Sequence, residues 1–303
     1  MPMVDAEITV KSRRLRDALE PVIGSVYFAP ECHDEYVALG FGASPGFAGK
    51  AALPDRPAYF TSRGSAMGQV AGHVVAAAFG VFNPKAVVPA VAHGWSLTDA
   101  TTIAAARARG ATDQLIRLLG EAPAGLDQVI ALLERAIAPL RPAVRPLFAG
   151  LLSLKAPAEP IGRMWYLGDL LREYRGDSHN AAWLSAGLDA IEIGLLTELY
   201  IGVPLHSYIR TRAWSDDDVA GALDRLASRG WIVDGTFTAD GQEGREAIEV
   251  ATDRQMRAAI EALGEDFEEL IGPLAAWSAT VCQGGGYLGG GARDLAEAPI
   301  AVD

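Results

Sequence analysis

Residues 211–249 decide the fold of this chain: TRAWSDDDVAGALDRLASRGWIVDGTFTADGQEGREAIE. Ser215 and the three aspartates after it can accept the free N–H groups of a first helical turn, where negative charge is also favourable, so they predict a helix start. Gly230 ends that helix. Residues 231–238 then form two short runs around an Asp-Gly pair, the strongest local signal for a hairpin. The stretch therefore predicts a helix, a short hairpin and a second helix.

Composition narrows the classes of protein to which the chain can belong. Its 303 residues leave room for one large or two ordinary domains, and half of them are apolar. The net charge of -12 repels nucleic acid and anionic membranes. No signal peptide or membrane-spanning run is visible, so we expect a cytoplasmic protein. Cys32 and Cys282 form no spaced motif, and we therefore expect no disulfide framework, no metal site and no cofactor.

Short motifs recur in the same order in the two halves of the chain. Two polar turns each precede an apolar run, and we expect each turn to open the helix that follows. A Trp-Ser pair then precedes a helix that an Arg-Gly pair ends, and an Ala-Thr-Asp run follows. The pairs of motifs are residues 62–65 and 174–177, 95–96 and 214–215, 109–110 and 229–230, and 111–113 and 251–253. We interpret the repeat as a duplicated module whose first copy lacks the hairpin; chance similarity in an alanine-rich helical chain is the alternative.

The hairpin region resembles the winged helix of the MarR family of bacterial regulators. The usual run of that family is matched by Asp224, Arg225, Leu226, Arg229, Gly230, Thr238 and Gly241. MarR proteins are symmetric dimers, so the resemblance implies that a fused duplication places two modules around a pseudo-two-fold axis, with a cleft between them. The predicted fold is mainly α, with tandem MarR-like winged-helix modules and one short β-hairpin wing.

The expected domain boundaries follow from this interpretation. A wingless helix-turn-helix-like module covers residues 1–138, and a proline-rich hinge covers residues 139–160. The winged-helix module covers residues 161–281. Residues 282–303 form a glycine-rich tail, which we expect to be irregular and either to wrap around the molecule or to move.

Three stretches outside the hairpin resemble a large actinobacterial family described as helix-turn-helix proteins: residues 27–31 (YFAPE), 59–68 (YFTSRGSAMG) and 170–182 (LLREYRGDSHNAA). Such proteins often appear near secondary-metabolite pathways. The resemblance therefore implies either a ligand-responsive regulator or a pathway enzyme built on a regulator's scaffold. The recurring polar positions of the family match Glu31, Ser62, Arg63, Arg175, Gly176, Asp177 and His179.

Electrostatics argue against DNA binding by the winged module. A recognition helix normally brings arginine, lysine, asparagine or glutamine to phosphates and base edges. Residues 205–250 carry five arginines against nine acids, and residues 216–218 place three of those acids where the helix tip would meet a duplex. If the module does bind DNA, the candidate contacts are Ser215, Arg225 and Arg229. We rank DNA below a small molecule as the partner.

A polar cluster at residues 173–180 is the candidate catalytic site. His179 follows Asp177 in what we expect to be the first turn of a helix. The helix dipole lowers the pKa of a histidine there and the carboxylate raises it, so His179 could exchange a proton near neutral pH. We take His179 as the acid/base group, with Asp177 or Glu31 as its partner. The alternative is structural: Arg175 and Asp177 pair at a helix junction, and His179 packs.

The candidate ligand-binding residues are those that could face the cleft. Arg63 and Arg175 can hold an anionic or carbonyl group; the turn before the first apolar run resembles an anion-binding turn, for which an ordinary helix cap is the alternative. Glu192 stands among apolar residues and needs a partner, so we expect it to face the cleft. Trp183 offers a flat stacking wall, unless it packs in the core. The predicted set is Ser62, Arg63, Arg175, Tyr36, Trp183 and Glu192.

Together these observations favour a small-molecule binding protein that uses an inter-module cleft on a repurposed winged-helix scaffold. We expect the ligand to be aromatic or anionic and of secondary-metabolite type. Acid/base turnover of an isomerase, lyase or hydrolase kind is left open. The alternatives are a MarR-like ligand-responsive transcription regulator that binds DNA through residues 215–229, and an interaction module without a pocket. We expect no membrane association and a monomer or a homodimer.

Overall fold

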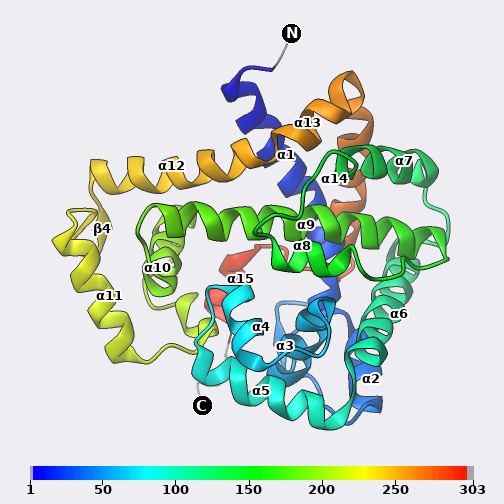
Figure 1. Ribbon diagram of the computed structural model, residues 1–303, viewed down its shortest axis with the longest axis horizontal. Coiled ribbons are helices and arrows are strands. Elements are labelled where there is room, and N and C mark those ends of the chain that lie inside the picture. The colour runs from blue at the N-terminus through cyan, green and yellow to red at the C-terminus, as the bar shows by residue number, and fades with distance from the viewer. Residues whose placement is uncertain (1–2, 299–303) are drawn as a thin grey trace.

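The protein is mainly helical, as predicted. The computed structural model describes residues 3–298, and within that range strands occur in two short antiparallel hairpins. In Figure 1 the long helix α9 (Pro160–Ser185) crosses the middle of the molecule. None of the helices in the described range is long and apolar enough to cross a membrane.

The remaining elements are these, in chain order. The first half contains α1 (Asp5–Ile23), η1 (Gly24–Phe28), α2 (Pro30–Ala38), β1 (Phe47–Ala48), β2 (Ala51–Ala52), α3 (Arg56–Gly64), η2 (Ser65–Met67), α4 (Gly72–Phe79), α5 (Pro84–Leu97), α6 (Ala100–Leu119), α7 (Leu126–Ile137) and α8 (Pro146–Leu151). The second half continues after α9 with α10 (Ala190–Ile201), η3 (Ile209–Arg212), α11 (Asp216–Ser228), β3 (Ile232–Val233), β4 (Thr236–Phe237), α12 (Ala239–Gln255), α13 (Arg257–Leu263), η4 (Gly264–Asp266), α14 (Phe267–Gln283) and α15 (Ala292–Glu297).

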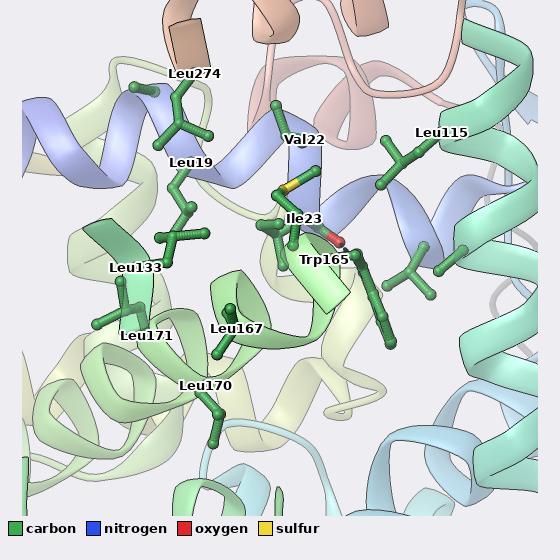
Figure 2. Packing of buried hydrophobic residues seen from close by; sticks show 14 of the residues in the cluster. Leu19, Val22, Ile23, Leu115, Leu133, Trp165, Leu167, Leu170, Leu171 and Leu274 are labelled. Carbon is green, nitrogen blue, oxygen red and sulfur yellow. Dashed lines mark hydrogen bonds between the residues drawn. The ribbon is translucent and has the colours of Figure 1, made fainter. Parts of the chain in front are cut away.

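The largest hydrophobic core surrounds α1, which packs along α14 and α9. The buried residues of α1 recur at helical spacing, so one face of the helix is apolar. Figure 2 shows two of them, Leu19 and Val22, in the same cluster as Leu274 of α14 and Trp165 of α9. Trp165 also donates its indole N–H to the carbonyl oxygen of Ile23 at 3.2 Å. Because this core contains residues from α1 to α14, it joins the two halves of the chain.

The predicted helix, hairpin and helix are confirmed in residues 216–255. Ser215 accepts the backbone N–H of Asp218 at 3.2 Å, and the Asp218 carboxylate binds back to Ser215, which starts α11 with a reciprocal cap. Gly230 has a φ of +78°, which lets the chain leave the helix. The strands β3 and β4 pair antiparallel, and α12 follows. We call residues 190–255, from α10 to the end of α12, the helix-turn-helix unit; Figure 1 shows α11 and β4 at one end of the molecule.

Two helix starts that the polar turns predict are wrong. Residues 62–64 form the last turn of α3 and do not open a helix. Residues 174–177 lie inside α9, which runs unbroken from Pro160 to Ser185, so Asp177 and Ser178 cap no helix of their own. The glycine at position 176 costs a helix only about 1 kcal/mol, and the buried residues on both sides of it outweigh that cost.

The expected helix end at Arg109-Gly110 is also wrong, because α6 continues through it for a total of 20 residues. Gly110 is buried against α2, and a Cβ at this position would lie 2.6 Å from the backbone nitrogen of Cys32. The glycine therefore permits close helix packing and does not stop the helix. The first motif series has no counterpart of the break at Gly230, and the duplication is not confirmed.

Three other regions are more ordered than the sequence indicates. The glycine and proline content of residues 43–57 predicts a loop, but this segment contains the β1–β2 hairpin. The proline-rich segment at residues 139–160 contains α8, whose Leu147 and Phe148 are buried. The glycine-rich tail contains α15, and residues 299–303 of that predicted tail lie outside the described range. The division into residues 1–138, 139–160, 161–281 and 282–303 stays a prediction.

Candidate functional site: an aromatic cavity beside the helix-turn-helix unit

A cavity of about 510 Å³ lies where α1, η1, α3, η3 and the C-terminal segment meet. We call it the aromatic cavity, because seven aromatic side chains line it. They are Tyr27, Phe28, Tyr59, Phe60, Phe82, Tyr208 and Tyr287. Their edges and faces are interlocked: the ring centroids of Tyr27 and Tyr59 are 5.1 Å apart, and so are those of Phe60 and Phe82. Such mutual packing fixes the rings as walls for a flat apolar guest.

Arg212 supplies a positive charge to this cavity. Its guanidinium lies 4.5 Å from the ring centroid of Phe82 and 4.5 Å from that of Tyr208. It also donates to the Tyr208 hydroxyl. No ion pair joins it to a carboxylate anywhere in residues 3–298. A half-buried cation held by two aromatic faces and a phenol hydroxyl offers a strong electrostatic attraction to an incoming anion.

Glu20 and Arg172 form one wall of the aromatic cavity. Arg172 donates two parallel hydrogen bonds to Glu20, at 2.9 and 3.0 Å. Tyr287 of the C-terminal segment donates to the same carboxylate at 3.2 Å. The wall is therefore electrically balanced, and it ties the C-terminal segment to α1.

Behind this wall the Tyr27 hydroxyl connects three arginine and carboxylate groups. It accepts from Arg172 at 3.1 Å and from Arg107 at 3.3 Å, and it donates to Glu173 at 3.3 Å. Burial raises the pKa of Tyr27 well above its usual value, so the hydroxyl stays protonated. Arg63 donates two hydrogen bonds to the Glu173 carboxylate, at 2.9 and 2.7 Å. Burial opposes ionisation of Glu173, but Arg63 and Arg172 outweigh it and lower its pKa to about 2.

The predicted catalytic residues have separate partners. His179 bonds to Thr252 at 3.1 Å, and burial lowers its pKa to about 4, so the ring is neutral at pH 7. Asp177 accepts the backbone N–H groups of Leu147 and Phe148, each at 3.1 Å, and thus caps α8. Burial raises the pKa of Asp177 to about 7.

Glu31 lies apart from these two groups, in the first turn of α2. It pairs with Arg117 of α6, in a partly exposed ion pair. No contact within residues 3–298 joins His179, Asp177 and Glu31, so their joint acid/base role stays a prediction that this geometry does not favour.

The predicted ligand residues divide into two groups. Arg63 and Arg175 do line one cavity together, a smaller one on the other side of the Glu20–Arg172 wall. The remaining four do not. Ser62 opens to another hollow, between α6 and α8; Tyr36 is buried against Phe41; Trp183 lies in the core of the helix-turn-helix unit; and Glu192 is part of the cap of α10.

The exposed face of α11 carries acids, as the sequence indicates. Asp216, Asp217 and Asp224 are exposed, whereas the two arginines near the end of this helix are engaged locally. Arg225 pairs with Asp189 and Glu192. Arg229 donates to the carbonyl oxygens of Ala186 and Gly187, and Ser215 is the cap described above.

Most of the aromatic cavity is not predictable from the sequence motifs. The YF pairs at residues 27–28 and 59–60 are visible as motifs, but nothing in the sequence places them beside η3. Tyr208, Arg212 and Tyr287 come from a turn and from a glycine-rich segment, which carry no periodic pattern. A signal does exist: aromatic residues in such irregular segments carry a large apolar surface that needs a packing partner.

Comparison with known proteins gives a single finding. The model of a family described as a helix-turn-helix family matches residues 12–288. No curated protein and no solved structure matches the chain. The matched range covers most of the chain and includes every residue of the aromatic cavity up to Leu288 and the whole helix-turn-helix unit. The chain therefore belongs to this helix-turn-helix family.

Proposed function

We propose that this protein is a ligand-binding helix-turn-helix protein, whose aromatic cavity takes a small organic acid with a flat apolar body. The observation that carries the proposal is Arg212, a cation that no carboxylate of the described range pairs with, set between two rings in a cavity of about 510 Å³. That volume falls within the roughly 300–1,000 Å³ typical of small-molecule sites. Apolar walls with a few polar groups that fix orientation are also typical of such sites.

The acidic group of the ligand would pair with Arg212. The Coulomb attraction between two unit charges is strengthened when water is excluded, as it would be once a flat body covers the cavity. The rings of Tyr59 and Phe82, 5.7 Å apart, would contact the apolar body. Burial of such a body contributes roughly 25 cal/mol per Å² of apolar surface removed from water.

The cavity is positioned to influence the helix-turn-helix unit. Tyr208, Thr211 and Arg212 line the cavity and lie directly before α11. Asn83 holds the backbone of this segment through two donated hydrogen bonds: its backbone N–H binds the Arg212 carbonyl at 2.9 Å, and its side-chain amide binds the Ala213 carbonyl at 2.8 Å. A ligand that draws Arg212 inward would therefore act on the turn that sets the position of α11.

The test is isothermal titration calorimetry with 2-naphthoate and with its uncharged analogue 2-naphthalenemethanol. We expect naphthoate to bind, and Arg212→Gln to weaken it at least tenfold while changing the affinity of the alcohol little. Arg229→Gln is the matched control, because Arg229 also pairs with no carboxylate of residues 3–298 but stacks on Trp231 at the end of α11. Equal affinity for wild type and Arg212→Gln, or no bound organic acid by titration and by native mass spectrometry, would reject the proposal.

A second candidate is a MarR-like transcription regulator that binds DNA through residues 215–229. The family match supports this candidate more directly than it supports a ligand, and α11 with its hairpin is exposed at one end of the molecule. The exposed aspartates of α11 oppose it. Electrophoretic retention of DNA from upstream of its own gene would test it. Specific retention that falls as salt rises, and that Arg225→Gln abolishes, would support DNA binding; no retention at low salt would contradict it.

Other predictions remain proposals beside these two. They are turnover of the ligand, an origin near secondary metabolism, and a monomeric or homodimeric state. The calorimetric test bears on turnover as well, because a substrate that is converted gives a continuing heat signal after each injection.

A further inference from the structure

A second cavity, of about 190 Å³, lies on the other side of the Glu20–Arg172 wall, between α1, α3, α9 and Met256. Its volume is well above the roughly 10–15 Å³ that one water molecule needs. Four arginines line it, from three different helices: Arg16, Arg63, Arg172 and Arg175. We call it the arginine cavity. Among the described residues that line it, the carboxylates are Glu20 and Glu173.

The two lining carboxylates are already bound on one side of the cavity. Glu173 is held by Arg63, and Glu20 by Arg172, in each case through two parallel hydrogen bonds. The lining itself carries four arginines against two carboxylates, although Glu249 and Asp253 bind Arg175 from outside the cavity, and the net charge of the whole chain is -12. The sign of the lining thus differs from that of the whole protein, which favours an anion over a cation or a neutral guest.

The other two arginines have donors to spare. Arg175 uses one terminal nitrogen to bind Glu249 and Asp253, each at 3.1 Å, while its other terminal nitrogen makes no hydrogen bond within residues 3–298. Arg16 donates its Nε–H to Asp17, and its terminal nitrogen is 3.7 Å from Glu249, too far for a hydrogen bond. Arginine nitrogens that no carboxylate of the described residues occupies can donate to an anion in the cavity.

Gly176 provides room for that anion. It lies inside α9 and lines the cavity, and the one described atom within 4 Å of a Cβ built there is the Glu173 Oε2, at 3.6 Å. Any longer side chain at this position would enter the space in front of Arg175. A glycine in the middle of a helix lowers its stability, so a role in leaving space explains its presence.

We infer that the arginine cavity binds a small oxyanion of the phosphate type, independently of the organic acid proposed for the aromatic cavity. The second terminal nitrogen of Arg175 and the guanidinium of Arg16 donate to its oxygens, since planar guanidinium groups suit oxyanions with several acceptors. The anion could be free phosphate or the acidic end of a larger molecule that reaches past Glu20 and Arg172, which both cavities share.

The experiment titrates inorganic phosphate into the full chain by calorimetry, at constant ionic strength kept with chloride. Wild type is compared with Arg16→Gln, which removes a donor, and with Gly176→Leu, which fills the space. The matched control is Arg14→Gln, an exposed arginine of the same helix that pairs with Glu268. We expect saturable binding in wild type and the control, and at least tenfold weaker binding in the two test variants.

Competition then distinguishes the two sources of the anion. If 2-naphthoate and phosphate bind at the same time, the occupant is a free oxyanion; if they exclude each other, it is the acidic end of one larger ligand. Absence of saturable phosphate binding in wild type would overturn the inference. So would equal binding in wild type, Arg16→Gln and Gly176→Leu. Arg16→Gln keeps the inference testable if Gly176→Leu fails to fold.

Discussion

Two regions of this protein carry the same short motifs and fold differently. In both, a Trp-Ser pair precedes a capped helix: Asp99 caps α6, and Ser215 caps α11. In both, an Arg-Gly pair follows further along the chain. Yet α6 runs on through Gly110 for a total of 20 residues, whereas α11 ends and the chain turns into the β3–β4 hairpin after Gly230.

The surroundings of each glycine explain this difference. Gly110 faces α2 and allows its backbone to come close, so packing holds the helix together across it. At Gly230 a Cβ would have no atom of the described residues within 4 Å, and the backbone adopts a φ of +78°, so the chain is free to turn there. A local motif therefore does not determine whether a helix stops; its tertiary contacts do.

The largest expected effect comes from substituting the two glycines of this comparison. Gly110→Ala would place a methyl group 2.6 Å from the backbone of Cys32, and we expect a loss of about 3 kcal/mol of stability from such overpacking. Gly230→Ala introduces no close contact and should cost only the strain of its left-handed backbone, about 1–2 kcal/mol. Denaturant unfolding followed by circular dichroism measures both. Similar losses for the two variants would show that Gly110 is not a packing contact.

The second prediction concerns the two polar turns, in which residue 65 of the first motif series corresponds to Asp177 of the second. Burial raises the pKa of Asp177 to about 7. The raised pKa means that the protonated form favours the fold: its contribution is complete below the ordinary pKa of an aspartate and is lost as pH rises through about 7.

Asp177→Asn keeps an acceptor for the N–H groups of Leu147 and Phe148 without the charge. We therefore expect the variant to be more stable than wild type at pH 8 by about 2 kcal/mol and to differ little at pH 4. Thermal unfolding across this pH range measures the difference. A constant difference from pH 4 to pH 8 would mean that the carboxyl titrates normally.

A smaller effect concerns the two caps. Ser215 takes part in a reciprocal cap with Asp218, so Ser215→Ala should cost about 1 kcal/mol and fray the start of α11. Asp99→Ala should destabilise α6 in the same direction, but the longer helix packs over much of its length and should fray less. Hydrogen exchange of the first turn of each helix measures this, and greater fraying in α6 would contradict it.

The sequence predicts the helix-turn-helix unit well, because its signals are local. The cap at Ser215, the stop at Gly230 and the Asp-Gly turn each act within a few residues, and the structure confirms all three. The acidic character of α11 also follows from the sequence, since aspartates next to a helix cap cannot be buried cheaply.

The candidate site can be predicted only in part, because it depends on contacts between distant segments. The sequence predicts that Arg63 and Arg175 act together in ligand binding, and the two do line one cavity. By contrast, the aromatic cavity joins η1 and α3, near the start of the chain, to η3 and to Tyr287, near its end. Neither periodicity nor motif spacing reports such a meeting, and the wrongly predicted helix breaks at residues 110 and 176 have the same cause.

The most direct test of a ligand site that acts on the helix-turn-helix unit is hydrogen exchange of wild type and Arg212→Gln, with and without 2-naphthoate. We expect the acid to protect residues 208–213 and the segment at residues 285–295 in wild type, and this protection to be lost in Arg212→Gln. Protection confined to other parts of the molecule, or protection that is the same in the variant, would contradict a site that works through Arg212.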